Sequence, residues 1–172
     1  MTSVIDVRAE QASDHPAIRA LHAAAFPTDA EARLVDALRA SARATVSLVA
    51  VEGGEVVGHV LFSPVTVARG DDGRGAGLAP VSVRASHRRR GIAETLIQSA
   101  LPRLLTTGRL WCVVLGEPHY YERFGFERAS DHDLQNEYGA TDAFMALELV
   151  PGALADKSGL VRYAPEFAAF SV

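Results

Sequence analysis

The sequence predicts an α/β fold in which one mixed sheet is flanked by helices within a single domain. Its 172 residues, 48% of them hydrophobic, suffice for one packed core and are few for two. Short β-rich runs alternate with amphipathic segments of helical period, in the order two helices, strands, helix, strand, helix, strands. The apolar run "RLWCVVL" is typical of a strand that is covered on both faces.

The first expected elements are a strand and two helices. Residues 3–8 form the first strand. Ser13 or Asp14 caps a helix that runs through about Phe26, with apolar residues at helical spacing. The stretch "TDAE" at 28–31 fits a capping box, which predicts the start of a second helix.

A hairpin and a longer helix are expected next. Two β-rich runs flank Gly53-Gly54, which predicts a tight turn between two strands. Pro64 predicts a bend, a bulge or a sheet edge in the second of these strands. The turn "ARGDDGRGAG" leads into the strand "LAPVSV". A helix then begins at about Gly91, and Pro102 is expected to kink or shorten its end.

The second half of the chain continues with strands and one short helix. The central strand "RLWCVVL" precedes the short helix "PHYYERF", which is followed by the strands "GFERA" and "DAFMALELV". The segment "SGLVRYAPEF" adds a last short strand. No repeat or linker interrupts this order, so residues 1–172 are expected to form one domain.

Composition and charge narrow the classes of function. The net charge is -4, and Lys157 is the only lysine among basic residues that are otherwise arginine. This balance argues against a nucleic-acid partner. No apolar run approaches the roughly 18–20 residues of a membrane span, so no membrane partner is expected. The amino terminus does not resemble a signal peptide, and a cytoplasmic protein is therefore expected.

Cysteine and metal chemistry are not indicated. Cys112 is the only cysteine, so no internal disulfide can form, and its apolar strand predicts a small buried hydrophobe. Asp131-His132-Asp133 suggests a metal site, but adjacent residues rarely ligate one ion well. No cysteine or histidine lies near it at zinc-like spacing, so no metal is predicted.

Positive charge is concentrated where the longer helix begins, in "VRASHRRRGIAETLI" at 83–97. Amides in the first turn of a helix have no intrahelical partner, and the helix dipole adds positive character there. Gly91 allows an anion to approach the backbone, and the arginines at 88–90 add charge-assisted hydrogen bonds. The arginines alone are more typical of a solvated surface run. The glycine and Ala93 that follow favour a phosphate site instead.

The run Arg88-Arg89-Arg90-Gly91-Ile92-Ala93 resembles the Gln/Arg-x-x-Gly-x-Gly/Ala signature of the GNAT N-acetyltransferases. In that family the amides of this loop hold the pyrophosphate of acetyl-CoA. The resemblance therefore implies that the backbone from Arg88 to Ala93, continuing toward Glu94, binds the acetyl-CoA donor. It also implies that Val81 and Val83 pair with the pantetheine arm.

A second stretch, "VVLGEPHYYERFGFERA", resembles the other GNAT signature, a strand followed by aromatic-Tyr-x-x-x-Gly-Phe. Tyr120 takes the aromatic place and Tyr121 the place of the tyrosine. The resemblance implies that the fourth and fifth strands splay apart and that the thioester lies in the gap. A phenol stays protonated at neutral pH and can donate to the departing thiolate, so Tyr121 is the expected catalytic acid. Core packing is the alternative role for either tyrosine.

Most of the chain, including "AFPTDAEARLVDALR" and "VSLVAVEGGEVVGHVLFSPV", resembles the YhbS-like branch of predicted bacterial acetyltransferases. This implies transfer of an acetyl group from acetyl-CoA to a primary amine of a small molecule or a protein. The donor-arm residues are compatible with a longer acyl donor as well. The non-enzymatic alternative is a CoA-binding sensor or regulatory module. Many GNAT proteins dimerise, so a homodimer is left open.

The general base has no clear candidate. The strand "GLAPVSV" lacks the glutamate that often serves as base in this family. Weak candidates are Glu117, His119, His59 and Glu31. The acceptor pocket is expected between the first two helices and residues 128–145, whose acidic residues favour a cationic acceptor if they are more than a surface loop.

Overall fold

The computed structural model describes residues 4–170. The strands are β1 Ile5–Ala9, β2 Val46–Glu52, β3 Glu55–Arg69, β4 Gly75–Val83, β5 Trp111–Leu115, β6 Glu127–Arg128, β7 Leu134–Asn136, β8 Phe144–Glu148 and β9 Ser158–Arg162. The α-helices are α1 His15–Ala25, α2 Ala30–Ala40, α3 Ile92–Thr106, α4 Pro118–Tyr121 and α5 Pro165–Ala169. The strands form one nine-stranded sheet with the path β1-β2-β3-β4-β5-β8-β6, and β9 pairs with both β3 and β7.

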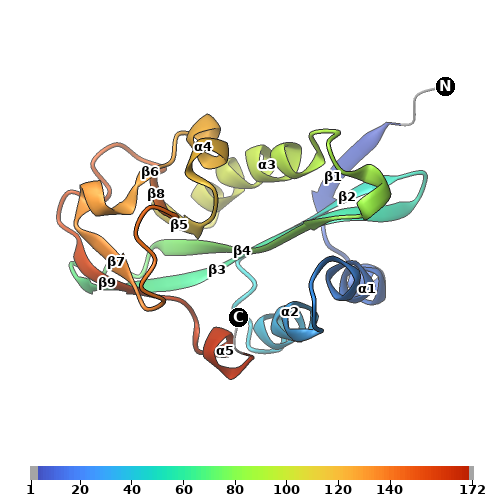
Figure 1. Cartoon of the computed structure of the whole chain (residues 1–172), viewed down its shortest axis with the longest axis horizontal. Coiled ribbons are helices and arrows are strands. Elements are labelled where there is room, and N and C mark those ends of the chain that lie inside the picture. The colour runs from blue at the N-terminus through green and yellow to red at the C-terminus, as the bar shows by residue number, and fades with distance from the viewer. Residues whose placement is uncertain (1–3, 171–172) are drawn as a thin grey trace.

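Helices cover both faces of this sheet (Figure 1), with α3 and α4 on one face and α1, α2 and α5 on the other. A hydrophobic core lies against each face. Because side chains alternate along a strand, Leu61 of β3 packs into the core under α1 and α2, and Phe62 packs into the core under α3. In β5, Trp111 packs into the core under α1 and α2 and Cys112 packs into the core under α3, and both residues are fully buried. The predictions of a doubly covered central strand and a buried cysteine are confirmed.

The long strand β3 connects two parts of the sheet. Its first part pairs with β2 as far as Phe62, and its last part pairs with β9 from Thr66 onward. Pro64 lies between these two ladders and is opposite Ala76 of β4. Proline has no N–H to donate, so this gap between partners is a position where it costs no ladder hydrogen bond on that side. The expected bulge is nearby, between Val60 and Phe62.

The fourth and fifth strands separate, as the resemblance implies. β4 and β5 pair in parallel from Gly75 opposite Trp111 to Leu78 opposite Val114. β4 then continues to Val83 with β3 as its partner and without β5. Most other ladders are antiparallel, so the predicted fold class, a mixed and mostly antiparallel sheet splayed at this point, is confirmed.

The amino-terminal elements differ in detail from the prediction. The first strand is Ile5–Ala9 rather than residues 3–8, and residue 3 lies outside the described residues. Asp14 is the N-cap of α1 by position, but its side chain accepts hydrogen bonds from Arg8 and from the Gln11 amide instead. The side chain is thus used to fasten the segment after β1.

The predicted capping box of the second helix is wrong. α2 begins at Ala30, and Asp29 rather than Thr28 is its N-cap residue. The Thr28 hydroxyl accepts a hydrogen bond from the Ala30 amide at 3.2 Å, so it closes a turn just before the helix. Glu31, which the box would require at the third helical position, is the second residue of the helix.

The hairpin and the later elements agree more closely. Gly53 and Gly54 both have positive φ and join β2 to β3, as predicted. α3 is not shortened at Pro102 but continues to Thr106. The strand expected in "GFERA" is limited to β6, and neither β7 nor α5 was predicted.

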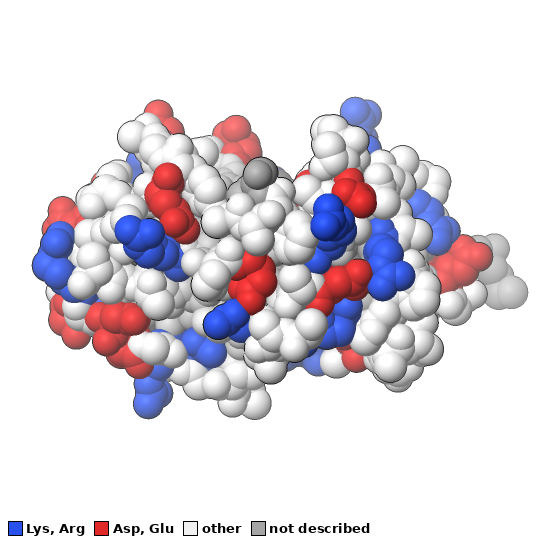
Figure 2. Space-filling model, turned by 90° about the horizontal axis from the view of Figure 1, so that it is seen from below, with Lys and Arg blue, Asp and Glu red and all other residues white. Residues whose placement is uncertain are grey.

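The surface carries charges of both signs. On the face that α1, α2 and α5 cover, acidic and basic side chains are interspersed (Figure 2). Among residues 4–170, no helix is both long and apolar enough to span a bilayer.

Candidate active site

The turn that joins β4 to α3 exposes a row of backbone amides. After a short 3-10 helix, Ala85–His87, the Arg88 amide reaches the carbonyl of Ala85 at 3.5 Å. The next amide with a backbone acceptor is that of Thr95, which donates to the Gly91 carbonyl at 3.0 Å. Within the described chain, the amides of residues 89–94 have no backbone partner. Together with the amino-terminal end of the α3 dipole, they form a site that favours an anion.

Glycine is needed at position 91 for its backbone conformation. Gly91 is the N-cap of α3 and has a φ of 76°. A Cβ at this position would meet no atom within 4 Å, so the strain would come from φ and the added atom would project into open space. Arg89 also has a positive φ, 64°, which is uncommon for a residue with a side chain. Two left-handed residues thus lie close together in the turn that leads into α3.

The three arginines of this turn face different neighbours. Arg90 donates to a carboxylate oxygen of Glu52 at 2.8 Å, and His87 contacts the other oxygen of Glu52 at 2.9 Å. Arg88 donates to the Val83 carbonyl at 3.3 Å. Arg89 makes no hydrogen bond or ion pair with any residue in the described part of the chain.

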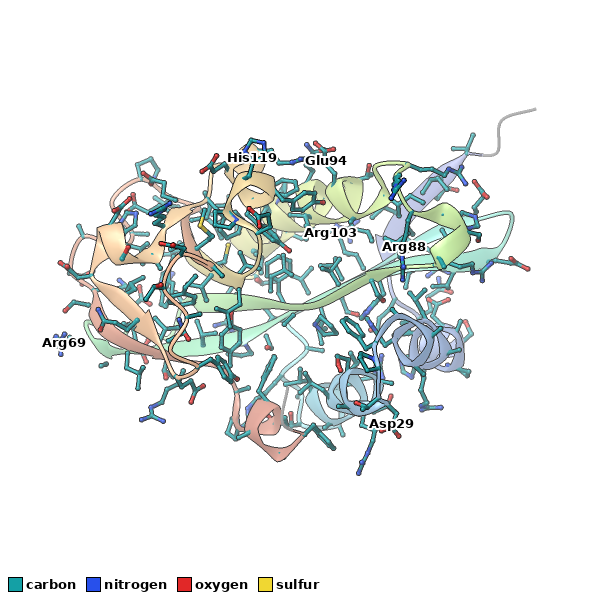
Figure 3. All side chains as sticks on the ribbon, viewed as in Figure 1. Asp29, Arg69, Arg88, Glu94, Arg103 and His119 are labelled. Atoms are coloured by element: carbon teal, nitrogen blue, oxygen red, sulfur yellow. The ribbon has the colours of Figure 1, made fainter. Side chains whose placement is uncertain are left out.

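A groove begins at these amides and follows the end of β4. Its largest cavity, about 380 Å³, is lined by most of the residues predicted to bind the donor, together with Tyr120 and Arg123. Cavities of about 210 Å³ and 280 Å³ continue it along β4 and under α1, and Val83 and Arg88 line all three. Figure 3 shows Arg88 at this end of the sheet, between α3 and α1.

Eight of the nine predicted donor-binding residues line this groove. The members are Val81, Val83, Arg88, Arg89, Gly91, Ile92, Ala93 and Glu94. Arg90 lines none of the three cavities because it is turned toward Glu52.

Tyr121 lies beside the groove and is largely buried. It ends α4, is 7% exposed, and packs with Phe126. Burial, and secondarily the neighbouring Tyr120, raises the pKa of Tyr121 to about 12. The Tyr121 hydroxyl has no hydrogen-bond partner among the described residues. It is not one of the fully buried polar atoms that lack a partner, so part of its surface is accessible. Its neighbour Tyr120 is the tyrosine that lines the largest cavity, where Arg123 stacks on its ring at 4.3 Å.

Gly116 and Arg123 belong to this region and were not predicted. A Cβ on Gly116 would lie 2.3 Å from a ring carbon of Tyr121, so only glycine lets that ring pack against the end of β5. Arg123 also contacts Glu94 of α3 at 3.6 Å. For Gly116, the sequence signal was a glycine directly after the central strand. No local sequence pattern marks Arg123 as part of the site.

The candidate bases are dispersed. Glu117 is exposed and caps α4 by accepting a hydrogen bond from the His119 amide, and His119 is also exposed (Figure 3). Glu31 lies in the first turn of α2 and lines none of the groove's cavities. His59 is fully buried in β3, where Nδ1 is 2.7 Å from Nε2 of His22 and Nε2 is 2.7 Å from the hydroxyl of the half-buried Ser47.

The Asp131-His132-Asp133 run is a loop. His132 contacts Glu127 at 3.4 Å, and Asp133 takes a left-handed conformation at the end of a 3-10 helix. Among residues 4–170, no three His, Cys, Asp or Glu side chains are placed to hold a metal ion.

Comparison with known proteins identifies the family. A profile of the Acetyltransferase (GNAT) domain matches residues 6–129, which include the β4–α3 turn, the splayed strands and Tyr121. The chain belongs to the GNAT acetyltransferase family. It is therefore an acetyltransferase, and acetyl-CoA is the donor that enzymes of this family use.

Several GNAT relatives align with this chain along nearly its whole length. The uncharacterized N-acetyltransferase YhbS of Escherichia coli K12 is 41% identical over 166 residues, which cover 95% of this chain and 99% of YhbS. The crystal structure of E. coli YhbS in complex with CoA superposes with a TM-score of 0.92, at 39% identity, and covers 98% of this chain and 94% of that one. A GNAT acetyltransferase from Brucella melitensis in complex with acetyl-CoA gives a TM-score of 0.79, at 35% identity, over 95% of this chain and 98% of that one. The predicted YhbS-like branch is confirmed.

Proposed function

We propose that this GNAT enzyme moves an acetyl group from acetyl-CoA to a primary amine of a small molecule or a protein, and that the β4–α3 turn holds the pyrophosphate of the donor. The observation that carries this proposal is the row of unpartnered amides at 89–94, which opens on the groove and has arginine side chains beside it. The E. coli and Brucella structures, which contain CoA and acetyl-CoA, support the same ligand here.

The exposed edge of β4 suits the pantetheine arm. Beyond Leu78 this strand has β3 on one side and no β5 partner on the other. An extended chain with amide groups can add to such an edge through backbone hydrogen bonds. Val81 and Val83 lie on this part of β4 and line the groove, so we assign them to that contact.

Tyr121 is assigned to protonation of the leaving group. When the amine nitrogen bonds to the thioester carbonyl carbon and the C–S bond breaks, the departing sulfur carries a negative charge. A phenol whose pKa is raised to about 12 stays protonated at neutral pH and can donate its O–H to the developing thiolate. It is a weaker acid than the thiol that forms, so the raised pKa lowers the driving force for complete proton transfer. The thiolate is a fair leaving group without help, so the contribution is expected at the lower end of the 10²–10⁴-fold range of general-acid catalysis.

The alternative that the sequence left, a CoA-binding sensor without transferase activity, has no observation of the structure or of the relatives in its favour. It shares the anion site and the groove with the enzyme and differs only in lacking transfer. Calorimetry with acetyl-CoA tests what the two share, and the absence of binding at millimolar donor contradicts both. Single-turnover transfer to a panel of primary amines then separates them, because only the enzyme consumes the donor.

The Tyr121→Phe variant tests the acid. We expect the transfer rate to fall about 10–100-fold while acetyl-CoA binding in the calorimeter is unchanged, because only the proton donor is lost. Tyr163→Phe is the matched control, since Tyr163 is as buried as Tyr121, lies outside residues 128–145 and lines none of the groove's cavities. If Tyr121→Phe transfers as fast as the parent, Tyr121 has a packing role only.

A further inference from the structure

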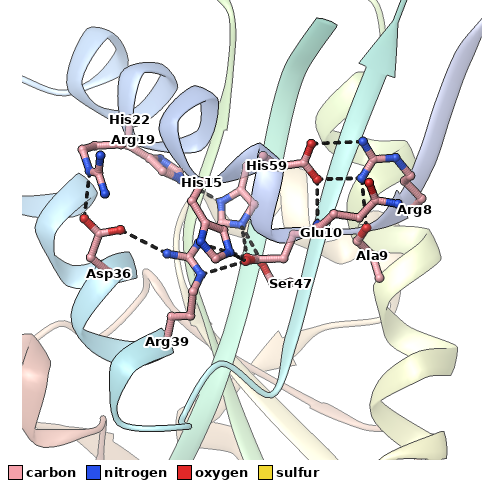
Figure 4. Close-up of polar contacts among 12 residues, drawn as sticks. Arg8, Ala9, Glu10, His15, Arg19, His22, Asp36, Arg39, Ser47 and His59 are labelled. Atoms are coloured by element: carbon pink, nitrogen blue, oxygen red, sulfur yellow. Dashed lines mark hydrogen bonds and ion pairs between the residues drawn. The ribbon is translucent and has the colours of Figure 1, made fainter. Parts of the chain in front are cut away.

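A hydrogen-bonded array of side chains lies between the sheet and α1, and Figure 4 shows its members from His22 to Glu10. The Ser82 hydroxyl is 2.8 Å from Nδ1 of His22, and Nε2 of His22 is 2.7 Å from Nδ1 of His59. Nε2 of His59 is 2.7 Å from the Ser47 hydroxyl, which bonds to Glu10. The array therefore runs from β4 under β3 and β2 to the segment that follows β1.

The two histidines of this array are sealed from solvent, and Ser82 is nearly so. Both histidines are 0% exposed and Ser82 is 7% exposed. At the far end, the carboxylate of Glu10 receives hydrogen bonds from Arg39 at 2.7 Å and 3.1 Å. Its other close neighbour is His15, whose Nε2 is 2.8 Å from a Glu10 oxygen and whose side chain is 30% exposed. One end of the array thus reaches solvent and the other reaches the groove.

The ionised end fixes the direction of every hydrogen bond. Burial opposes ionisation of Glu10, but hydrogen bonds from Arg39 and Ser47 outweigh it and hold the pKa of Glu10 below its usual range. A carboxylate only accepts, so the Ser47 hydroxyl must donate to it. Ser47 then accepts from Nε2–H of His59.

The same logic extends to the groove. A neutral imidazole has one donor and one acceptor nitrogen, so Nδ1 of His59 accepts from Nε2–H of His22. Nδ1 of His22 in turn accepts from the Ser82 hydroxyl. With its proton committed to His22, the Ser82 oxygen presents only lone pairs to other groups.

Ser82 is in a position to use those lone pairs. Together with Val81, Val83 and Phe26 it lines the cavity of about 210 Å³ that continues the groove. The groups that such an oxygen binds are N–H and O–H donors. An amine that attacks the thioester is a donor of this kind and must lose a proton as it reacts.

We propose that the Ser82 hydroxyl takes this proton from the substrate amine and that the array passes it to the Glu10 end, an inference that rests on the transfer reaction proposed above. The N–H proton goes to the Ser82 oxygen while the Ser82 proton goes to Nδ1 of His22. Successive Nε2 protons then move to His59 and to Ser47, and the Ser47 proton reaches the Glu10 carboxylate. From there it leaves to solvent, to which the Glu10 side chain is 13% exposed. Before the next turnover a proton crosses the array in the opposite direction, and both rings regain their Nε2–H tautomers.

The array conducts a proton and does not store one. Burial, and then the nearby His59, lowers the pKa of His22 to about 3, and burial also lowers the pKa of His59. Neither ring therefore carries a charge at neutral pH. The charged or titratable groups around them are Glu10, Asp14, His15 and Arg39. This explains why no single buried histidine acts as the base, although one was a candidate.

The first test reads the hydrogen-bond direction without any substrate. In ¹⁵N–¹H NMR spectra of the full chain labelled at histidine, both His22 and His59 are expected as neutral Nε2–H tautomers between pH 6 and pH 8. Ser82→Ala should shift the Nδ1 signal of His22, because that nitrogen loses its donor. An Nδ1–H tautomer at either ring reverses the deduced direction and overturns the proposal.

The second test reads the reaction, with acetyl-CoA and an excess of n-butylamine as probes and thiol release as the signal. Ser82→Ala is expected to lower the rate about 100-fold at pH 7, with the loss shrinking as pH rises toward the pKa of the amine, where free amine and hydroxide replace the relay. Ser82→Thr keeps a hydroxyl and should recover most of the rate. Ser63→Ala is the control, since Ser63 is a buried strand serine whose hydroxyl has no partner among the described residues.

The outcomes separate this proposal from the proposed function. If the parent chain releases no thiol in response to the amine, the transfer reaction is contradicted. The histidine tautomers seen by NMR then test the hydrogen-bond direction of the array by themselves. A Ser82→Ala variant with the parental rate at every pH overturns the relay but not the transferase. A loss that is the same at every pH and equal in Ser63→Ala means that the array only packs the core, and it also overturns the relay.

Discussion

The arginines before α3 show how much the direction of one side chain matters. Arg88 and Arg89 line the largest cavity of the groove, whereas Arg90 pairs with Glu52 and lines none of its cavities. All three are exposed, so composition and exposure do not separate them. What separates them is the left-handed backbone at residue 89, which turns adjacent side chains to different sides.

This geometry predicts unequal effects of neighbouring arginines on donor binding. Arg89→Ala should weaken acetyl-CoA binding about 10-fold, because a charge-assisted hydrogen bond to phosphate is lost at an exposed site. Arg90→Ala, the matched control, should weaken it by less than about threefold, since exposed pairs such as Arg90–Glu52 contribute little. Calorimetry with acetyl-CoA measures both. A larger loss in Arg90→Ala than in Arg89→Ala contradicts the assignment.

At the scale of elements, α3 contains an internal proline. Pro102 is exposed and lies well inside the helix, which continues to Thr106. Proline lacks the N–H that would bond to the carbonyl of Gln98, one turn earlier, and its ring crowds that turn. The apolar face of α3, with Leu96 and Leu104 fully buried, holds the helix together past this point.

Replacing this proline should stabilise the protein. Pro102→Ala restores a helical hydrogen bond and removes the steric conflict, offset in part by the greater entropy of the unfolded chain. We expect a gain of about 1–2 kcal/mol, which for a chain of this length raises Tm by about 2–6 °C. Pro165→Ala is the control, because Pro165 begins α5, where proline is favourable. Thermal unfolding followed by circular dichroism that shows a lower Tm for Pro102→Ala contradicts this account.

At the scale of the whole molecule, the buried histidines tie stability to pH. The pKa of His22 is lowered to about 3 by burial, against an ordinary value of 6.5 in the unfolded chain. As pH falls below 6.5, the unfolded chain binds a proton that the folded chain does not bind. The stability that this group contributes is therefore complete above pH 6.5 and is lost progressively down to about pH 3. The lowered pKa of His59 acts in the same direction.

The free energy of unfolding should thus decrease on mild acidification. From pH 7 to pH 5 we expect His22 alone to account for a loss of about 2 kcal/mol. In His22→Gln this dependence should be smaller by that amount, whereas His119→Gln, at an exposed position, should leave it unchanged. Urea unfolding at several pH values measures it. Equal pH dependence in the parent and in His22→Gln means that His22 is not held neutral by the fold.

The sequence by itself determined the family, the fold class and most elements of this protein. Local chemistry carries these features: glycines permit the turn at 53–54 and the helix start at 91, and apolar periodicity marks α3 and β5. The assignment of the donor site and of Tyr121 also came from local motifs, and their roles stay predictions. Local pattern was weaker for short elements, such as β7 and α5, and for the start of α2.

The tertiary structure decided which side chains meet. Ser82, His22, His59, Ser47 and Glu10 come from five separate segments, and no spacing along the chain relates them. The same holds for Arg90 and Glu52, or for Tyr121 and Gly116, which meet only when strands and helices pack. Motifs report the backbone conformation of a few neighbouring residues, whereas a polar array depends on sheet register and helix placement, which are set by the packing of the whole core.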